Sequence, residues 1–444
     1  MATMTGDQSA NVSGTKYIDS RCIVEFRPDD NWKGEYGFDW FRRGDTKENI
    51  NGSISQSNYK PIVGKYAPHD PDYGDDGTLQ VDKSGGKPEK SYYAYRLARE
   101  EYPVFKIKGI DRIYIAPYIS LFFASTKQGE NRLPMQMLYK NENGGYSKHD
   151  FCKVKATVKL LIEAKNIKSI EFVCDDELSV SPKTISTVPD GQSSDQKLSI
   201  RFNYMFNGDG HKAIKVFAYH KDGVTKTFAG QLNVVRCKPK AVDVCFVNVK
   251  ISRGYNVSSG FADTDFIDEQ KKNLRRFFAQ AHIIPNITTA DLDLDRSDLD
   301  GFFKSFPSKR GYTTFESIMV EGVNGNAFFP QKLEQLFGRP DVYKVFFLGE
   351  KGCFWDGEYV GLAGIAKDIP SKTLVIYENP DESVVCHEIL HCFGLWHSFS
   401  NNSNHTFEKY KTSNIMDYST DTYTLWRWQW NKIRNDADGT ELVQ

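Results

Sequence analysis

The sequence predicts a multidomain protein with a β-rich N-terminal region, a β-sandwich in the middle and an α/β or α+β C-terminal domain. Three observations predict this class: a length of 444 residues, short alternating apolar runs in mid-chain, and strand-like and helix-like runs that alternate towards the end. A chain of this length accommodates about two to four domains. We expect a disordered tail over 1–16, a β-rich domain over 17–147, the sandwich over 148–238 and the C-terminal domain over 239–444.

The first part of the chain is polar and then becomes rich in aromatic residues. Residues 1–16 are small and polar, which is typical of a disordered tail. The runs RCIVEF and DRIYIAPYISLFFA predict strands, and the turn-rich stretch between them predicts irregular structure. This pattern indicates a β-rich domain.

Apolar and polar residues alternate from about Lys148 onward. In KVKATVKLLIEA one face is apolar, while lysines and Thr157 occupy the other face. The apolar residues are Val154, Ala156, Val158, Leu160 and Ile162. Such alternation predicts half-buried strands, and turn signals such as NGDG and KDG separate them. Together they predict an Ig-like β-sandwich of about 90 residues, which ends at the linker CKPKA.

The pattern changes after this linker. AVDVCFVNVKI predicts a buried strand, and residues 265–281 predict a helix because their apolar side chains fall on one face. PQKLEQLFGRP predicts a short helix that starts at Pro330 and ends before Gly338. TLWRWQWNKIR predicts a last helix, with Asp421 as its cap. The linker also predicts that a fragment starting near Lys238 folds on its own.

The composition excludes several classes of function. The net charge is −1 at pH 7, so no global positive field would attract nucleic acid, and no apolar run is long enough to span a membrane. The first residues lack the basic and apolar segments of a signal peptide. We therefore expect a protein that stays in the cytoplasm until a non-classical route exports it, to the outside or into a target cell.

The stretch CHEILHCFGLWHSF holds the candidate metal ligands. His387 and His391 are four residues apart, a spacing that places two imidazoles on one face of a helix. Glu388 stands where such sites have their general base. Gly394 can adopt a left-handed conformation, end the helix and turn the chain so that His397 becomes the third ligand. Three histidines predict one catalytic zinc ion with an open fourth position for water.

This pattern, HExxHxxGxxH over 387–397, resembles the signature of the metzincin zinc metallopeptidases. Metzincins also carry a methionine on a tight turn beneath the zinc, and Met416 in TSNIMDYS matches it. Tyr418 resembles the tyrosine that binds zinc at rest in astacins and serralysins. Ser398 is more similar to matrixins, so the resemblance assigns no subfamily.

The resemblance implies a metzincin-like catalytic domain and a mechanism. Zinc-activated water would attack the peptide bond of a polypeptide substrate, with Glu388 as the general base and the Tyr418 hydroxyl near the oxyanion. An edge strand for the substrate would precede the helix, with Thr373–Glu378 as the next strand and the helix starting near Asp381. The residues of that edge strand would be Leu362, Ala363, Gly364, Ile365 and Ala366.

The stretch VEFRPDDNWKGEYGFDWFRRGD resembles N-terminal modules of cargo and effector proteins of bacterial contractile injection systems. The resemblance implies a secreted or injected toxin that contacts the secretion apparatus through residues 1–238. An ordinary β-domain with aromatic core residues is the alternative for this stretch. Two further alternatives for the whole chain are a zinc-containing binding or structural cargo protein without proteolysis and a zinc amidase acting on cell-wall cross-links.

Two weaker signals do not predict metal sites. DLDLDRSDLDG resembles a calcium loop only loosely, because Arg296 stands where such a loop has glycine and Phe302 where it has its last ligand. We therefore expect no Ca²⁺ there and a solvated entry to a helix. His405 precedes the methionine turn, and we expect it on the surface rather than on the metal.

Overall fold

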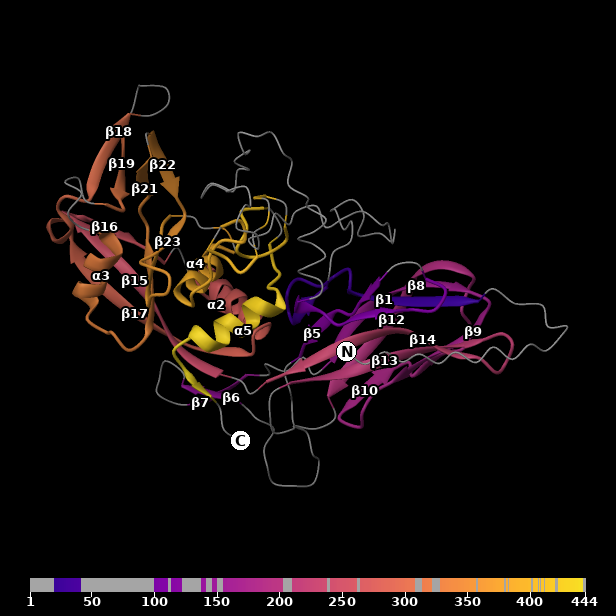
Figure 1. Cartoon of the computed structure of the whole chain (residues 1–444). Coiled ribbons are helices and arrows are strands. Elements are labelled where there is room, and N and C mark those ends of the chain that lie inside the picture. The colour runs from indigo at the N-terminus through magenta and orange to yellow at the C-terminus, as the bar shows by residue number, and fades with distance from the viewer. Residues whose placement is uncertain are drawn as a thin grey trace.

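The computed structural model gives a β-rich multidomain protein with several sheets and few helices (Figure 1). The described residues are 20–40, 100–110, 113–121, 137–140, 146–149, 155–202, 210–237, 240–261, 264–307, 314–321 and 328–441, without 357, 379–380, 382, 401, 406, 408, 411, 420 and 421. The predicted tail over 1–16 and the predicted cap Asp421 lie outside them. No helix in the described residues is long and apolar enough to cross a membrane.

Two sheets pack face to face as a β-sandwich, drawn in purple and magenta on the right of Figure 1. The first sheet has the order β1 (Arg21–Pro28), β8 (Lys155–Lys165), β12 (Gly191–Phe202) and β10 (Leu178–Ser181). The second has the order β11 (Thr184–Ile185), β9 (Ile167–Val173), β13 (Gly210–His220), β14 (Lys226–Arg236), β5 (Tyr118–Ser120) and β2 (Gly37–Asp39). The sandwich thus includes strands from both sides of the boundary predicted at 147.

The aromatic N-terminal stretch contributes to the core of this sandwich. Trp32, Phe38 and Trp40 are at most 8% exposed, and their rings pack edge to face. These contacts favour the interpretation of the stretch as ordinary aromatic core. Two small hairpins accompany the sandwich. They are β3 (Val104–Lys106) with β4 (Ile113–Ile115), and β6 (Met137–Lys140) with β7 (Tyr146–His149).

The C-terminal region is built around the long strand β15 (Lys240–Arg253). It runs parallel to β17 (Ile283–Asp295) and β20 (Tyr343–Leu348), and β24 (Thr373–Ile376) continues the sheet parallel to β20. The antiparallel strands are β16 (Asn256–Ser259), β25 (Thr440–Glu441) and β23 (Gly364–Ala366), and β23 forms the edge beside β24. Parallel strands need long crossover connections: α2 (Thr264–Ala279) lies between β15 and β17, whereas β21 (Gly352–Asp356), β22 (Glu358–Leu362) and β23 lie between β20 and β24.

Alternating residues of β15 enter two different cores, as the period of a strand dictates. Val244 and Phe246 face the core that is shared with α2 (Thr264–Ala279), α4 (Val384–Cys392) and α5 (Arg427–Asp436). Cys245 and Val247 face the other core. That core is shared with α3 (Phe329–Phe337) and with the sheet of β18 (Phe303–Pro307), β19 (Thr314–Met319), β21 (Gly352–Asp356) and β22 (Glu358–Leu362).

The two ends of the described chain meet between the sandwich and the C-terminal sheet. Tyr102 and Tyr118 belong to the same buried cluster as Trp428 and Trp430 of α5. The buried carboxylate of Asp39 accepts hydrogen bonds from the Tyr102 hydroxyl, at 2.7 Å, and from the backbone N–H of Arg427, at 2.9 Å. The core of the C-terminal region therefore includes side chains from residues 100–121.

Several local predictions differ from the structure. The last helix starts at Arg427, after Trp426, rather than near Asp421. The carboxylate-rich stretch continues β17 to Asp295, which then caps the short 3₁₀ helix η1 (Arg296–Leu299). His405 is 1% exposed, so the expectation of a surface residue was wrong; its ring packs against Trp428 and lies 3.4 Å from the Glu101 carboxylate.

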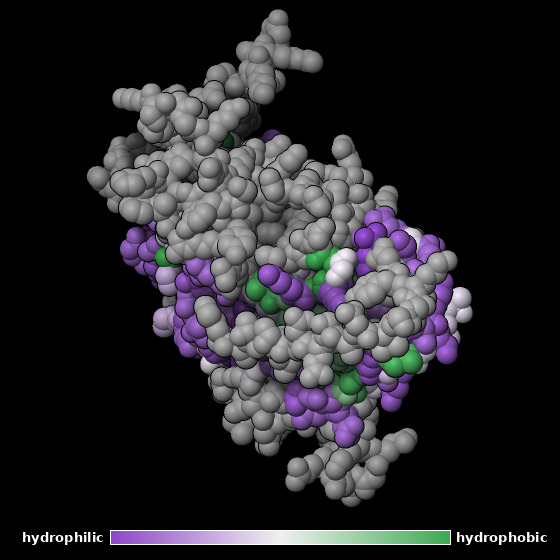
Figure 2. Space-filling model, turned by 45° about the vertical axis from the view of Figure 1, so that its right-hand side comes forward, coloured by the Kyte–Doolittle hydropathy of each residue, from purple (hydrophilic) through white to green (hydrophobic). Residues whose placement is uncertain are grey.

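The surface in Figure 2 is mostly hydrophilic where its residues are described. Hydrophobic residues gather there in small, separate patches. A surface of this kind is ordinary for a globular protein.

Candidate metal centre

Helix α4 positions the first two histidines. Its residues Val385, Ile389 and Leu390 are buried in the core shared with α2 and α5, and this fixes the rotation of the helix about its axis. His387 and His391 then lie on the same face, one turn apart. The helix is short and starts after Ser383, whose N–H and hydroxyl both donate to Asp381.

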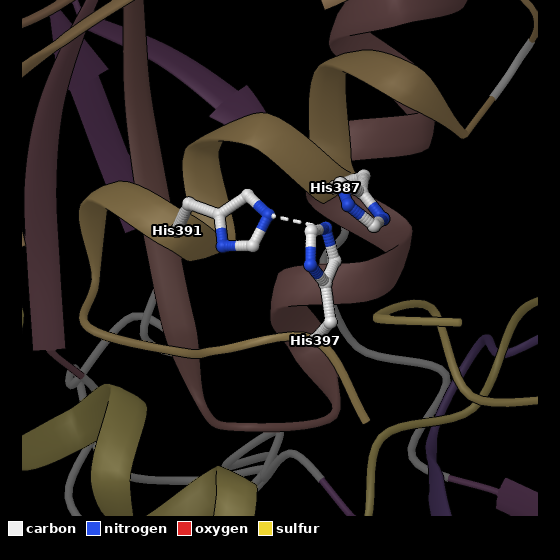
Figure 3. Close-up of side chains that lie close together, drawn as sticks. All are labelled: His387, His391 and His397. Carbon is white, nitrogen blue, oxygen red and sulfur yellow. Dashed lines mark hydrogen bonds between the residues drawn. The ribbon is translucent and has the colours of Figure 1, made fainter. Parts of the chain in front are cut away.

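A glycine ends this helix and brings in the third histidine. Gly394 has φ of +82°, in the left-handed region, and the N–H of Leu395 donates to Leu390 O across the turn. A Cβ atom at Gly394 would lie 2.5 Å from a carboxylate oxygen of Asp436. The left-handed conformation therefore favours glycine, and a larger residue would also displace the Asp436 side chain. The chain reverses here, and His397 faces the two histidines of α4 (Figure 3).

The three imidazoles converge on one point. One ring nitrogen from each residue lies within 4.8 Å of the others, and Nε2 of His391 is 3.1 Å from Nε2 of His397. Nδ1 of His387 is 2.8 Å from Ile415 O, and Nδ1 of His391 is 2.6 Å from Leu395 O. A carbonyl oxygen only accepts, so both Nδ1 atoms carry hydrogen and both Nε2 lone pairs are left for a ligand.

All three rings are held in the neutral form. Burial lowers the pKa of His387 and lowers that of His391 well below its ordinary value. Burial and the neighbouring His387 lower the pKa of His397 to about 3. Neutral imidazoles are the form that binds metal ions. The cluster can therefore hold a metal ion, and three imidazole nitrogens suit zinc as well as copper, nickel or iron.

The turn that carries Met416 contacts the histidine segments through its backbone carbonyls. Met416 is fully buried, its N–H donates to Asn414 Oδ1, and its carbonyl accepts from the N–H of Ser398. Ile415, whose carbonyl fixes the tautomer of His387, belongs to the same turn. The turn thus supports both the first and the third histidine.

Tyr418 reaches the cluster from the end of this turn. Its hydroxyl oxygen is 2.9 Å from Nε2 of His397, and the residue is 49% exposed. Burial of the hydroxyl and the nearby charge of Glu388 raise the pKa of Tyr418 far above its ordinary value. Tyr418 is therefore a neutral hydroxyl at the edge of the cluster, able to donate a hydrogen bond.

Glu388 lies between α4 and the edge strand β23. Burial raises the pKa of Glu388 to about 8, although a hydrogen bond from the backbone N–H of Ala366 opposes the shift. A Cβ atom at Gly364 would lie 2.8 Å from Cγ of Glu388. The carboxylate is thus packed against β23, and its burial makes it a stronger base than an exposed glutamate.

The predicted edge strand over 362–366 is divided between two sheets. Gly364, Ile365 and Ala366 form β23 at the edge of the large sheet, but Leu362 ends β22 in the four-stranded sheet. Ala363 lies between them, and its carbonyl accepts from the N–H of Tyr377. The edge beside Glu388 is therefore shorter than predicted.

The sequence interpretation missed two residues beside the cluster. Asp417 accepts hydrogen bonds from the N–H groups of Tyr410, Thr412 and Tyr418 and so closes the loop that carries Tyr418. The ammonium of Lys409 lies about 5 Å from three ring centroids, those of Phe399, Tyr410 and Tyr418. The aspartate next to Met416 was a visible turn signal, whereas nothing local marked Lys409.

No family model and no curated protein matches the sequence. Among solved structures, a family 123 glycoside hydrolase from Clostridium perfringens, described for glycolipid glycan hydrolysis, is similar with a TM-score of 0.14 and 6% sequence identity. The match covers 47% of this chain and 46% of that chain, so the chain spans less than half of its length. A likeness this low carries no argument about fold or function.

Proposed function

We propose that the chain is a zinc-dependent endopeptidase with a metzincin-like catalytic domain over 239–444. The observation that carries the proposal is the geometry around α4. Three neutral imidazoles converge within 4.8 Å, and Glu388 from the same helix lies against the edge strand β23. A structural zinc site would need a fourth protein ligand and would not need Glu388 beside the histidines.

Each residue has a defined part in this proposal. His387, His391 and His397 would hold the zinc ion, which would supply a polarised water of lowered pKa. Glu388 takes the proton of the attacking water and delivers it to the leaving amine.

Two further groups act on the substrate. The Tyr418 hydroxyl donates a hydrogen bond to the oxygen of the carbonyl under attack, because it is neutral and stands at the edge of the cluster. Strand β23 pairs on one side with β24, and its other edge offers backbone groups to an extended peptide. The edge of β23 favours a polypeptide substrate over a cell-wall amide.

Metal content and turnover test the proposal together. We expect one equivalent of zinc per chain after metal repletion, and cleavage of an unstructured protein such as casein. Glu388→Gln should keep the zinc and the Tm but lose about 10²–10⁴-fold in kcat, because it removes only the proton acceptor. Glu269→Gln, at a half-buried position on α2, is the matched control and should behave as the unmodified chain.

The outcomes separate the alternatives. A chain that binds zinc but cleaves neither protein nor cross-linked cell wall would be a binding or structural protein. Cleavage of cell-wall cross-links alone would identify an amidase. Near-normal proteolysis by the Glu388→Gln variant would overturn the role given to this residue.

A further inference from the structure

A thiol and an imidazole meet where the sandwich joins the C-terminal sheet. Cys237 follows β14 and precedes β15, and His282 lies in the turn between α2 and β17. Sγ of Cys237 is in hydrogen-bond contact with Nδ1 of His282. The imidazole is 1% exposed, whereas Cys237 is half-buried. The pair lies outside the histidine cluster of α4.

The other nitrogen of His282 fixes which tautomer faces the thiol. Nε2 is 3.0 Å from Leu121 O and 3.1 Å from Ser120 Oγ. A carbonyl oxygen only accepts, so Nε2 carries hydrogen and the lone pair of the neutral ring is on Nδ1. That lone pair points at the Cys237 thiol. When the proton moves to Nδ1, the thiolate accepts from Nδ1–H and Leu121 O still accepts from Nε2–H.

The backbone holds His282 in a conformation that few residues adopt. Its φ is +55°, in the left-handed region. Its N–H donates to Ala279 O at 3.2 Å, and its carbonyl accepts from the N–H of Lys240 at 3.0 Å. Strained conformations of this kind persist only where the surroundings determine them, and they cluster at functional sites. The imidazole is therefore fixed in place by the chain on both sides.

We propose that Cys237 is a nucleophilic thiol activated by His282, and that it is a site of modification by low-molecular-mass disulfides. A nucleophile, a base in contact with it and a third group that orients the base form the arrangement typical of activated nucleophiles. The thiolate of Cys237 attacks one sulfur of the disulfide, and the new S–S bond forms as the old one breaks. The departing thiolate takes the proton from Nδ1 of His282, so the step needs no other reactant.

The remaining described cysteines lack this combination of exposure and base. Five are buried, and burial raises the pKa of each of them: Cys22, Cys245, Cys353, Cys386 and Cys392. Cys174 is half-buried like Cys237, but its S–H donates to Leu178 O at 3.4 Å, and burial raises its pKa. Cys174 thus serves as an internal control of similar exposure.

Competitive labelling of the full chain tests the proposal. Limiting iodoacetamide at pH 7, followed by peptide mass spectrometry, compares the two half-buried thiols within one sample. We expect Cys237 to react at least about 10-fold faster than Cys174, since thiolate is the reacting form. Oxidised glutathione should likewise modify Cys237 first. Equal rates at Cys237 and Cys174 in the unmodified chain would overturn the proposal, whatever the variants do.

A variant isolates the contribution of the imidazole. His282→Asn suits the position because asparagine tolerates the left-handed conformation, yet it offers no base. We expect the labelling of Cys237 to fall to within about 3-fold of Cys174, while the rate at Cys174 stays unchanged. An unchanged rate at Cys237 in a variant of normal Tm would show that exposure alone sets its reactivity.

Discussion

The Tyr418 hydroxyl lies 2.9 Å from Nε2 of His397, the same nitrogen that faces His391. If the hydroxyl donates to the oxyanion, Tyr418→Phe should keep zinc and fold but lower kcat, with KM little changed, because the contact is made only in the transition state. The expected loss is about 10²–10³-fold at most. Steady-state kinetics on a quenched peptide measures it. The matched control is Tyr410→Phe, at a neighbouring exposed tyrosine, and should leave kcat unchanged.

Gly364 tests the packing of Glu388 against β23. A Cβ atom there would lie 2.8 Å from Cγ of Glu388, so Gly364→Ala should displace the carboxylate and lower kcat about 10-fold or more while zinc stays bound. Gly361→Ala on β22 meets no heavy atom within 4 Å and is the control. Equal activity of the two variants would show that Glu388 does not depend on this contact.

Glu334 on α3 gives a pH-dependent contribution to stability. Burial alone would raise its pKa, but hydrogen bonds from Lys367, Thr373 and the fully buried Lys344 lower it to about 2. The folded value is below the ordinary value of 4.5, so the stabilisation is present above about pH 4.5 and is lost as pH falls through 2.

The variant Glu334→Gln should therefore unfold more easily at pH 7, by at most about 3–5 kcal/mol, since it leaves the charge of Lys344 buried. The difference from the unmodified chain should shrink below pH 4.5. Urea unfolding at pH 7 and at pH 3 measures both effects. Asp438→Asn removes the carboxylate partner of Lys372 at a residue whose side chain is 69% exposed, and should change stability by less than about 1 kcal/mol.

A substitution at Asp39 tests the contact between the sandwich and the last helix. Its two carboxylate oxygens accept from Tyr102 and from the backbone of Arg427, so Asp39→Asn would present an amide N–H to one of these donors. We expect a loss of about 1–3 kcal/mol in unfolding free energy. Glu269→Gln is the control: its ion pair with Lys272 joins side chains that are 44% and 75% exposed, and the variant should lose less than about 1 kcal/mol.

The same contacts change the expectation for a fragment that starts near Lys238. Without residues 20–121 it lacks Tyr102 and Tyr118, which pack in the cluster of Trp428 and Trp430. We now expect its Tm to lie below that of the full chain, and differential scanning calorimetry measures the difference. An equal Tm would support the independent domain that the linker predicted.

What could be predicted from the sequence was local. The spacing of His387 and His391 and the turn at Gly394 depend on neighbouring residues, and the structure brings the predicted histidines together. The helix over Phe329–Phe337 is also confirmed, with Gly338 left-handed at its end. The histidine motif and the helix with its terminal glycine each depend on a few consecutive residues.

What could not be predicted depends on residues far apart in the chain. The hydrogen bond from His387 Nδ1 to Ile415 O uses a backbone carbonyl as its acceptor. Because every residue has such a carbonyl, no residue type in the sequence indicates this hydrogen bond. His405 was placed on the surface because it stands in a polar loop, but Trp428 and Glu101 enclose it. The sandwich extends to β1 and β2 through long-range pairings, such as Arg21 with Lys165 and Gly37 with Ser120, which alternation alone does not encode.

The contact between Asp39 and Arg427 joins positions 388 residues apart, and this sets the order in which the molecule can be completed during synthesis. The sandwich strands leave the ribosome first and can pair early, whereas the core beneath α4 must wait for α5. The carbonyl of Ile415 and the hydroxyl of Tyr418 also emerge after all three histidines. A nascent chain that stops near residue 400 therefore carries every imidazole but not the turn that orients them, and the metal centre becomes complete only with the last few dozen residues.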